Sequence, residues 1–370
     1  MEVMRIEPQT ITHLQEWLGK TESFQDTVTS APVRALSATL DREDPTPSKG
    51  TFLPELWHWL YFLPHARESE IGPDGHPKRG GFLPPVPLPR RMWAGSRIEW
   101  LKPLAVGDEI ERVSTIESVT HKAGRTGDLI FVLVNHKISN QNGLAIIEEH
   151  DIVYRDAPGP DDKPVAPTPA PTDAKWSKTI TPDDVLLFRY SALTFNGHRI
   201  HYDRKYVTEV EGYPGLIVHG PLIATLLVDL VRQSIPGCKL KSFEFRAIRP
   251  TFDINLFKVS AKPDLEKDPS GLYYYFLIRP VGNLKQYRRG VVGSFTLDSA
   301  SLMPKNFREI INTPHLSEEL VLERGAFLFR ELAKKGNISE YMVMRDYVEW
   351  PDSTLTYNIH TNRWVYHQGK

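Results

Sequence analysis

The sequence predicts an α+β protein made of two similar units. A proline-rich stretch at residues 157–172 divides the 370-residue chain. On each side of it, four strand-like segments separated by turn signals accompany one apolar, helix-like segment. A sheet with one apolar face needs a second layer, and a helix can provide that layer. The repeated pattern therefore indicates a divergent internal duplication in which each antiparallel sheet packs on a helix.

The first unit is expected over residues 1–156. Its apolar stretch at 53–63 precedes a Gly/Pro-rich loop and is expected to supply the helix. The strand-like segments that follow lie near residues 94–102, 109–120, 128–138 and 144–154. Turn signals separate them at residues 107–108, 124–127 and 140–143.

Residues 157–175 are expected to form a linker. Alternating prolines remove backbone hydrogen-bond donors and favour the polyproline II conformation, which makes such a segment a semi-rigid spacer. The linker therefore separates two packed units.

The second unit is expected over residues 176–299. Residues 220–235 predict a helix, with Pro221 suited to its first turn. One face at helical spacing is apolar, and it consists of Leu222, Ile223, Leu226, Leu227, Leu230 and Val231. Strand-like segments follow near residues 239–249, 254–262, 271–280 and 289–298.

Residues 300–370 form a C-terminal extension with its own pattern. An amphipathic helix is expected at 317–335, ending near Gly336, and strands are expected at 347–350 and 354–357. A short apolar run follows at 364–366. The extension could cover a sheet edge, mediate dimerisation, or have no catalytic role.

The composition excludes several classes of partner. A net charge of −1, from 45 basic and 46 acidic residues, predicts no nucleic-acid partner and no anionic membrane surface. Cys238 is the only cysteine, so a reducing compartment is the simpler expectation. Acidic residues near the N-terminus argue against a signal or transit peptide; they are Glu2, Glu7, Glu16, Glu22 and Asp26. Cytoplasm is therefore expected, with the mitochondrial matrix as the alternative.

One segment concentrates the side chains that suit proton transfer beside a carbonyl group. It contains Asn196 and Asp203 together with two imidazoles, His198 and His201. Histidine titrates near neutral pH and can take or give a proton. A third imidazole, His219, directly precedes the predicted helix, whose first N–H groups could stabilise a developing oxyanion.

The order of these residues resembles a known family. Asn-x4-His, followed by Gly-x3-His-Gly-Pro-Leu at residues 215–222, is similar to the signature of the MaoC-like hydratases. These are double hot-dog proteins that act on thioesters of coenzyme A. Longer strings resemble the branch that contains mesaconyl-CoA and itaconyl-CoA hydratases; they lie at 56–63, 80–95, 192–203 and 243–250. The resemblance, which also extends to the mitochondrial hydroxyacyl-thioester dehydratases, covers residues 8–298.

The resemblance implies a double hot-dog fold and a hydro-lyase reaction. Adding water across an α,β-unsaturated thioester needs a base for water at C3, an acid for C2, and donors for the enolate oxygen. His201 matches the family histidine, and the N–H of Gly220 would hold the oxygen. Asn196 stands where relatives have an aspartate, so it can orient water but cannot transfer a proton. Asp203 could supply the missing carboxylate, because positions 201 and 203 of an extended segment point the same way.

Several other residues are candidates for substrate binding. His198 and His219 could contact substrate, or only pack and shape the loop. Three arginines could pair with CoA phosphates or a substrate carboxylate, or with surface carboxylates; they are Arg199, Arg246 and Arg249. Although the three histidines could ligate zinc, their spacing matches no closed zinc motif. We therefore expect no metal and no cofactor.

Three functions remain open on the sequence alone. The first is hydration of a short branched dicarboxylic substrate such as mesaconyl-CoA or itaconyl-CoA. The second is dehydration of a 3-hydroxyacyl thioester in type II fatty-acid synthesis, on CoA or an acyl-carrier protein. The third is a non-catalytic thioester-binding protein, which Asn196 motivates. A homodimer is a possible assembly for each of them.

Overall fold

The computed structural model describes residues 5–124, 127–156, 172–263, 273–281, 291–297, 341–343, 353–358 and 363–368. The expected linker lies outside these residues over 157–171, as do the helix expected at 317–335 and the strand expected at 347–350. Among the helices described, none has the length and apolarity needed to cross a membrane.

Over its described residues, the N-terminal half contains two α-helices, two short 3-10 helices and five strands. In chain order these are α1 (Pro8–Gln15), β1 (Thr21–Thr27), α2 (Ser30–Thr39), η1 (Trp57–Leu60), η2 (Glu68–Glu70), β2 (Arg90–Trp100), β3 (Glu109–Gly124), β4 (Gly127–Asn140) and β5 (Gly143–Arg155). The four strands expected from the sequence correspond to β2–β5, and β1 was not expected.

The C-terminal half repeats the arrangement with more helix. Its elements are β6 (Trp176–Ile180), α3 (Asp184–Leu193), η3 (Arg199–His201), α4 (Arg204–Glu209), α5 (Gly220–Ser234), β7 (Leu240–Ala247), β8 (Leu256–Pro263), β9 (Tyr273–Val281) and β10 (Val291–Leu297). The helix expected at 220–235 and the four expected strands are confirmed. In the C-terminal extension, β11 (Tyr341–Val343), β12 (Ser353–Asn358) and β13 (Arg363–Gln368) form a separate antiparallel sheet.

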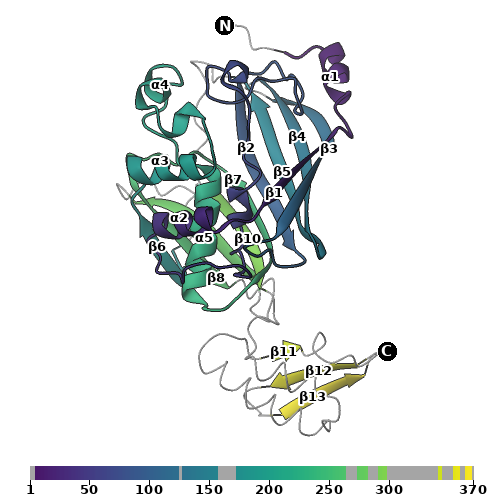
Figure 1. Ribbon diagram of the computed structural model, residues 1–370, viewed down its shortest axis with the longest axis vertical. Coiled ribbons are helices and arrows are strands. Elements are labelled where there is room, and N and C mark those ends of the chain that lie inside the picture. Colours follow the sequence, from purple (N-terminus) through teal and green to yellow (C-terminus); the bar gives the residue numbers. More distant parts are fainter. Residues whose placement is uncertain are drawn as a thin grey trace.

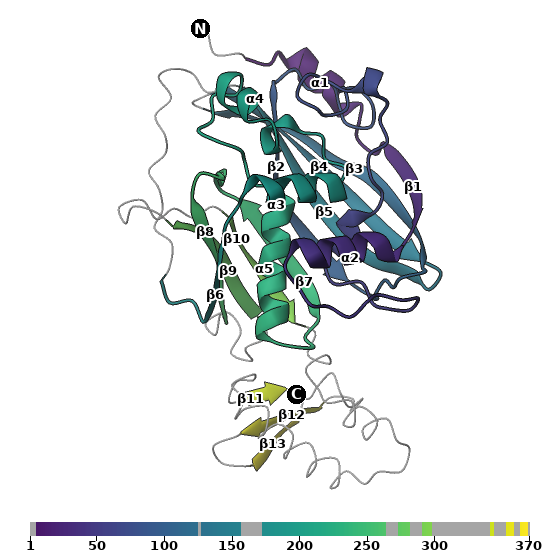
Figure 2. The ribbon, with the colours of Figure 1, turned by 60° about the vertical axis from the view of Figure 1, so that its left-hand side comes forward.

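The two halves join edge to edge into one ten-stranded sheet. Its order is β1-β3-β4-β5-β2-β7-β10-β9-β8-β6, and all neighbouring strands are antiparallel. The pair β2–β7 forms the seam, so each half contributes five consecutive strands. In both ribbon views, α2 and α5 lie on the same side of this sheet (Figures 1 and 2). The α+β prediction is confirmed.

The seam depends on a glycine. Gly95 on β2 pairs with Arg246 on β7, next to a register shift between Trp93 and Gly95. A Cβ atom on Gly95 would lie 2.3 Å from the carbonyl oxygen of Phe245. The two halves therefore approach too closely at this point for any residue with a side chain.

The helix of the N-terminal half is not the one that the sequence suggested. The stretch at 53–63 forms only the single 3-10 turn η1, and α2 is the helix that packs in this half. Leu56 and Phe62 have φ values of +70° and +56°. These left-handed conformations on either side of η1 prevent a continuous α-helix through the stretch.

Helix α5 lies in the main core, which both halves build. Every residue from Leu222 to Val231 is buried, including Thr225 and Asp229, so burial extends around the helix beyond the one apolar face expected. Asp229 tolerates this position because its carboxylate accepts a hydrogen bond of 2.7 Å from Arg42, which follows α2. The same core contains Leu36 of α2 and Phe243 of β7. Packing in this core fixes the position of α5.

Candidate active site

The loop that carries the predicted catalytic residues begins where α3 ends. Phe195 adopts a left-handed conformation with φ of +48°, and the Asn196 N–H donates to the carbonyl of Ser191 at 2.8 Å. The Asn196 side chain then accepts from the N–H of His198 at 3.0 Å, which closes a tight turn. The chain continues into η3, which ends at His201.

His201 is buried and held in one orientation. Its Nδ1 lies 2.7 Å from the carbonyl oxygen of Ile217, and the Ile217 N–H donates back to Ile200 at 3.0 Å. Because a carbonyl only accepts hydrogen bonds, Nδ1 carries the proton and Nε2 keeps its lone pair. The neutral tautomer can therefore accept a proton at Nε2.

His219 packs directly against this ring. The two imidazoles are stacked with centroids 3.8 Å apart and an interplanar angle of 19°. His219 is fully buried, and its Nε2 lies 2.8 Å from the hydroxyl of Ser191. It occupies the position that precedes α5 without a side-chain cap bond. His219 thus packs between His201 and α3, a location compatible with its expected packing role.

The N-terminus of α5 lies beside these rings. The Ile223 N–H donates to the carbonyl of His219 at 3.0 Å, and Pro221 has no N–H. The Gly220 amide therefore precedes the helix's own hydrogen-bond ladder, where the helix dipole favours negative charge. Gly220 also faces the other half, since a Cβ atom there would lie 3.8 Å from the ring of Trp93.

A buried carboxylate in the N-terminal half fixes Trp93. Glu148 accepts from Trp59 at 3.0 Å and from Ser96 at 3.2 Å, and His58 Nε2 lies 3.1 Å away. The Trp93 indole N–H lies 3.0 Å from the Ser96 hydroxyl. Burial would raise the pKa of Glu148, but the hydrogen bond with His58 and nearby imidazoles lower it to about 2. No local pattern indicates this network, because it joins η1, β2 and β5, which lie far apart in the chain.

Asp203 does not lie as the sequence suggested. The segment at 199–201 is a 3-10 turn and not an extended strand, so the expectation that positions 201 and 203 point the same way is wrong. The Asp203 carboxylate caps α4 by accepting from the N–H of Tyr206 at 2.9 Å. It also accepts from Arg199 at 2.7 Å. Both oxygens hold the loop, which removes the geometric reason for assigning Asp203 a proton-transfer role.

The three arginines predicted to bind substrate lie in different parts of the structure. Arg199 pairs with Asp203, lies over the Tyr206 ring at 4.1 Å, and donates to the carbonyl of Pro73 at 3.0 Å. It therefore helps to dock two loops. Arg246 is exposed on β7, and Arg249 is half-buried beyond the end of that strand. Their binding of CoA phosphates or a substrate carboxylate stays a prediction.

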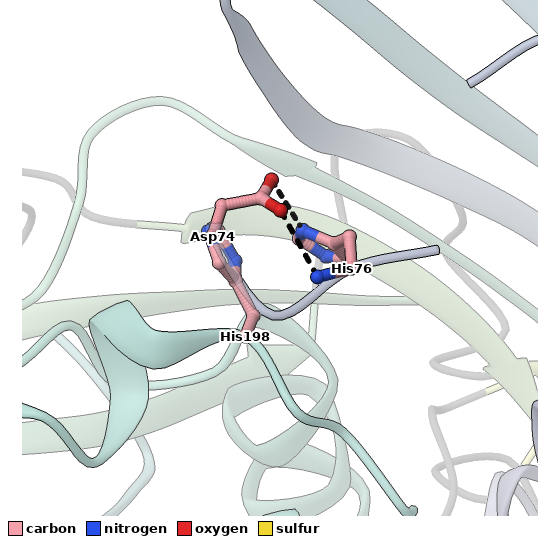
Figure 3. A group of neighbouring side chains, drawn as sticks. All are labelled: Asp74, His76 and His198. Carbon is pink, nitrogen blue, oxygen red and sulfur yellow. Dashed lines mark hydrogen bonds and ion pairs between the residues drawn. The ribbon is translucent and has the colours of Figure 1, made fainter. Parts of the chain in front are cut away.

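A loop from the N-terminal half adds two residues that the sequence did not single out. Asp74 and His76 lie against His198, with the His76 and His198 ring centroids 4.0 Å apart (Figure 3). Asp74 Oδ2 lies 3.1 Å from His76 Nδ1. The spacing Asp-x-His carries no distinctive signal, and these residues lie more than 120 positions from His198.

The three residues of Figure 3 are also the group best placed to meet a cation. One donor atom from each of Asp74, His76 and His198 lies within 4.8 Å of the others, and the described segments contain no other such group of three. The hydrogen bond between Asp74 and His76 accounts for their proximity without a metal. The zinc site considered for His198, His201 and His219 is not among the groups that come this close.

Burial keeps the imidazoles of His198, His201 and His219 neutral at physiological pH. It lowers the pKa of His201 to about 4 and that of His198 to about 2, and it lowers the pKa of His219 well below its usual value. For His201, the hydrogen bond with Ile217 opposes this effect. All three rings therefore rest in the neutral form, and His201 is the one whose hydrogen bond leaves Nε2 with a lone pair.

The lowered pKa of His201 predicts how the rate of the reaction depends on pH. His201 can accept a proton only while Nε2 is unprotonated, so kcat/KM should stay level from about pH 8 to pH 5 and fall as pH approaches about 4. Initial rates across this range would measure the pH at which kcat/KM falls, and circular dichroism at each pH would control for acid unfolding. A fall centred near the ordinary histidine pKa of about 6.5 would contradict the assignment.

Comparisons with known proteins agree with the chemistry of the site. Residues 56–253, more than half of the chain, match the family described as hydroxyacyl-thioester dehydratase type 2. The chain is 47% identical over 255 residues to mesaconyl-C(4)-CoA hydratase of Chloroflexus aurantiacus, covering 67% of this chain and 88% of that protein. It is 27% identical over 259 residues to the mitochondrial hydroxyacyl-thioester dehydratase type 2 of Schizosaccharomyces pombe, covering 62% and 86%.

Solved structures share the fold at low sequence identity. A MaoC-like dehydratase aligns with a TM-score of 0.53 and 14% identity, covering 75% of this chain and 98% of its own. HtdX of Mycobacterium tuberculosis aligns with a TM-score of 0.53 and 16% identity, covering 74% and 98%. The double hot-dog prediction is confirmed. The chain is a hydro-lyase, and it belongs to the hydroxyacyl-thioester dehydratase type 2 family.

Proposed function

We propose that this enzyme hydrates the double bond of a mesaconyl-C4-CoA-type thioester. The observation that carries the proposal is the 47% identity to a mesaconyl-C(4)-CoA hydratase over 88% of that protein's length. The site geometry supports the same reaction, because it combines a fixed proton acceptor with the amide of a helix N-terminus. The substrate would be a CoA thioester of a short, branched, unsaturated dicarboxylic acid.

In this reaction the water oxygen bonds to C3 as His201 Nε2 takes one proton from the water. The electron pair of the double bond moves toward C2 and the thioester carbonyl, and C2 then takes up a proton. The hydrogen bond to Ile217 holds the ring, so that Nε2 meets the water in one orientation. The Asn196 side-chain oxygen already accepts from the backbone N–H of His198, so the NH2 group of the same amide would donate to the water and orient it.

The negative charge that develops on the thioester oxygen would be stabilised at α5. The Gly220 N–H precedes the hydrogen-bond ladder of a 15-residue helix, where the dipole favours an anion. Because Gly220 lacks a side chain, the oxygen can approach its amide closely. The Trp93 ring lies opposite and would border the acyl group.

A second candidate is dehydration of a straight-chain 3-hydroxyacyl thioester. The family match over residues 56–253 and the Schizosaccharomyces pombe relative favour it. The same residues would act in the reverse order: a proton leaves C2, and the 3-hydroxyl departs as water. The two candidates therefore differ in acyl group and direction rather than in chemistry.

Steady-state hydration assays distinguish the candidates. We expect kcat/KM for mesaconyl-C4-CoA to exceed that for crotonyl-CoA by at least about 100-fold, because crotonyl-CoA lacks the free carboxylate and a site built for a polar substrate group rejects analogues without it. Faster turnover of crotonyl-CoA or of straight-chain 3-hydroxyacyl thioesters would favour the dehydratase. Tight binding of a thioester without turnover of any substrate would indicate the non-catalytic binding protein.

A further inference from the structure

We propose that His76, backed by Asp74, is the residue that exchanges a proton with C2 of the substrate. The N-terminal half would thereby supply the second proton-transfer group, which Asn196 cannot provide because it has no carboxylate. This inference rests on the proposed hydration reaction. It makes the active site a joint product of both halves of the chain.

Ring contacts place His76 in one continuous row with the histidines of the candidate active site. Its ring lies 4.0 Å from that of His198, which lies 5.4 Å from His201, and His201 stacks on His219 at 3.8 Å. His219 directly precedes Gly220 at the start of α5. The row therefore leads from Asp74 to the helix N-terminus proposed to hold the thioester oxygen.

Hydrogen bonding makes His76 the better-supported proton acceptor of this row. Asp74 Oδ2 lies 3.1 Å from His76 Nδ1, whereas the Nδ1 of His201 faces only the neutral carbonyl of Ile217. A carboxylate on Nδ1 fixes the tautomer and stabilises the imidazolium that forms when Nε2 takes a proton. A carbonyl stabilises that cation less. A proton taken up by His201 would therefore be held at lower free energy on His76.

The groups that face His76 are consistent with a neutral resting ring. Burial lowers its pKa, as do the positive charges of Arg91 and Arg79, while Asp74 opposes them. Burial would raise the pKa of Asp74, but the hydrogen bonds from His76 hold it below its usual value. Asp74 thus remains a carboxylate while His76 is ready to accept.

The loop that carries Asp74 and His76 is held firmly enough to position a proton-transfer group. A Cβ atom on Gly75 would lie 1.8 Å from the carbonyl oxygen of Gly197, so the two loops interlock through their glycines. The Arg199 N–H also donates to the carbonyl of Asp74 at 2.9 Å. Asp74 holds its partner twice, because its Oδ1 accepts the His76 backbone N–H at 3.0 Å. Figure 3 shows this carboxylate directed at His76.

Protons are conserved when His201 and His76 act together. In hydration, His201 takes a proton from water as oxygen bonds to C3, and the excess proton passes to His76 through His198 or solvent. The His76 imidazolium then gives a proton to C2, and both rings end neutral. In dehydration, neutral His76 removes the C2 proton, and the proton returns through His201 to the departing hydroxyl.

Two variants and a chemical rescue test the proposal in the full-length enzyme. His76→Ala should lower kcat by about 10²–10⁴-fold with little change in KM, and added imidazole should restore part of the rate. It should also slow exchange of the C2 proton of the hydrated product with D2O. Asp74→Asn keeps a hydrogen-bonding side chain but removes the charge, so kcat should fall at least about 10-fold.

A matched control and the opposing outcomes keep the test decisive. His13 forms a carboxylate pair with Glu16 at 3.3 Å on exposed α1, and His13→Gln should leave the rate unchanged. Wild-type rates and C2 exchange in both His76→Ala and Asp74→Asn would overturn the inference but leave hydration intact. Loss of activity on chelation that Zn²⁺ restores would overturn it in favour of a cation site. Absence of wild-type turnover would overturn the proposed function and this inference together.

Discussion

Replacing His201 with alanine is expected to lower kcat for hydration by about 10²–10⁴-fold. In the proposed reaction this ring, held by Ile217 and His219, supplies the nitrogen that takes the proton from water. KM should change little, because the proposed contacts to the thioester come from Gly220 and Trp93. Steady-state rates with mesaconyl-C4-CoA would measure both parameters.

The interpretation requires that the variant remains folded. His201 is buried and stacked on His219, so its removal leaves a cavity, and the thermal midpoint should fall modestly. His201→Gln retains more volume and a hydrogen-bonding group but cannot carry a proton. Equal kcat values for the wild type and either folded variant would exclude His201 as the base.

A second large effect is expected on stability. Gly95→Ala should destabilise the protein by about 2–4 kcal/mol, because the new Cβ atom would lie 2.3 Å from the backbone oxygen of Phe245. That oxygen belongs to β7, so the strands of the seam must separate for the methyl group to fit. Urea unfolding followed by circular dichroism would measure the change.

Gly81 provides the matched control for this substitution. A Cβ atom there meets nothing within 4 Å, and its backbone does not require a left-handed φ. Gly81→Ala should therefore change the free energy of unfolding by less than about 0.5 kcal/mol. A Gly95→Ala protein as stable as the Gly81→Ala protein would contradict the close seam between the two halves.

The strands and the main helix were predictable because their signals are local. Turn residues and alternating side chains bounded β2–β5 and β7–β10, and the apolar run after Gly220 indicated α5. The first helix was not predictable in this way. The stretch at 53–63 is more apolar than α2, and left-handed conformations at Leu56 and Phe62 arise from tertiary packing that periodicity does not encode.

The site was predictable only where one segment carries it. His201, His219 and Gly220 were identified because their spacing resembles a family signature, and the structure brings them together at the N-terminus of α5. The expectation for Asp203 is wrong because residues 199–201 form a 3-10 turn, whereas the alignment of positions 201 and 203 requires an extended segment. Asp74 and His76 were missed because they reach the site from the other half, and their approach depends on the interlocked Gly75 and Gly197.

Hydration of mesaconyl-C4-CoA in D2O, followed by mass spectrometry of the product, tests the central claim most directly. The wild type should form a product that carries one deuterium at C2 for each water added at C3. His201→Ala should form almost none in the same time while still binding the thioester. Product formed by His201→Ala at the wild-type rate, with the same deuterium content, would show that proton transfer does not depend on His201.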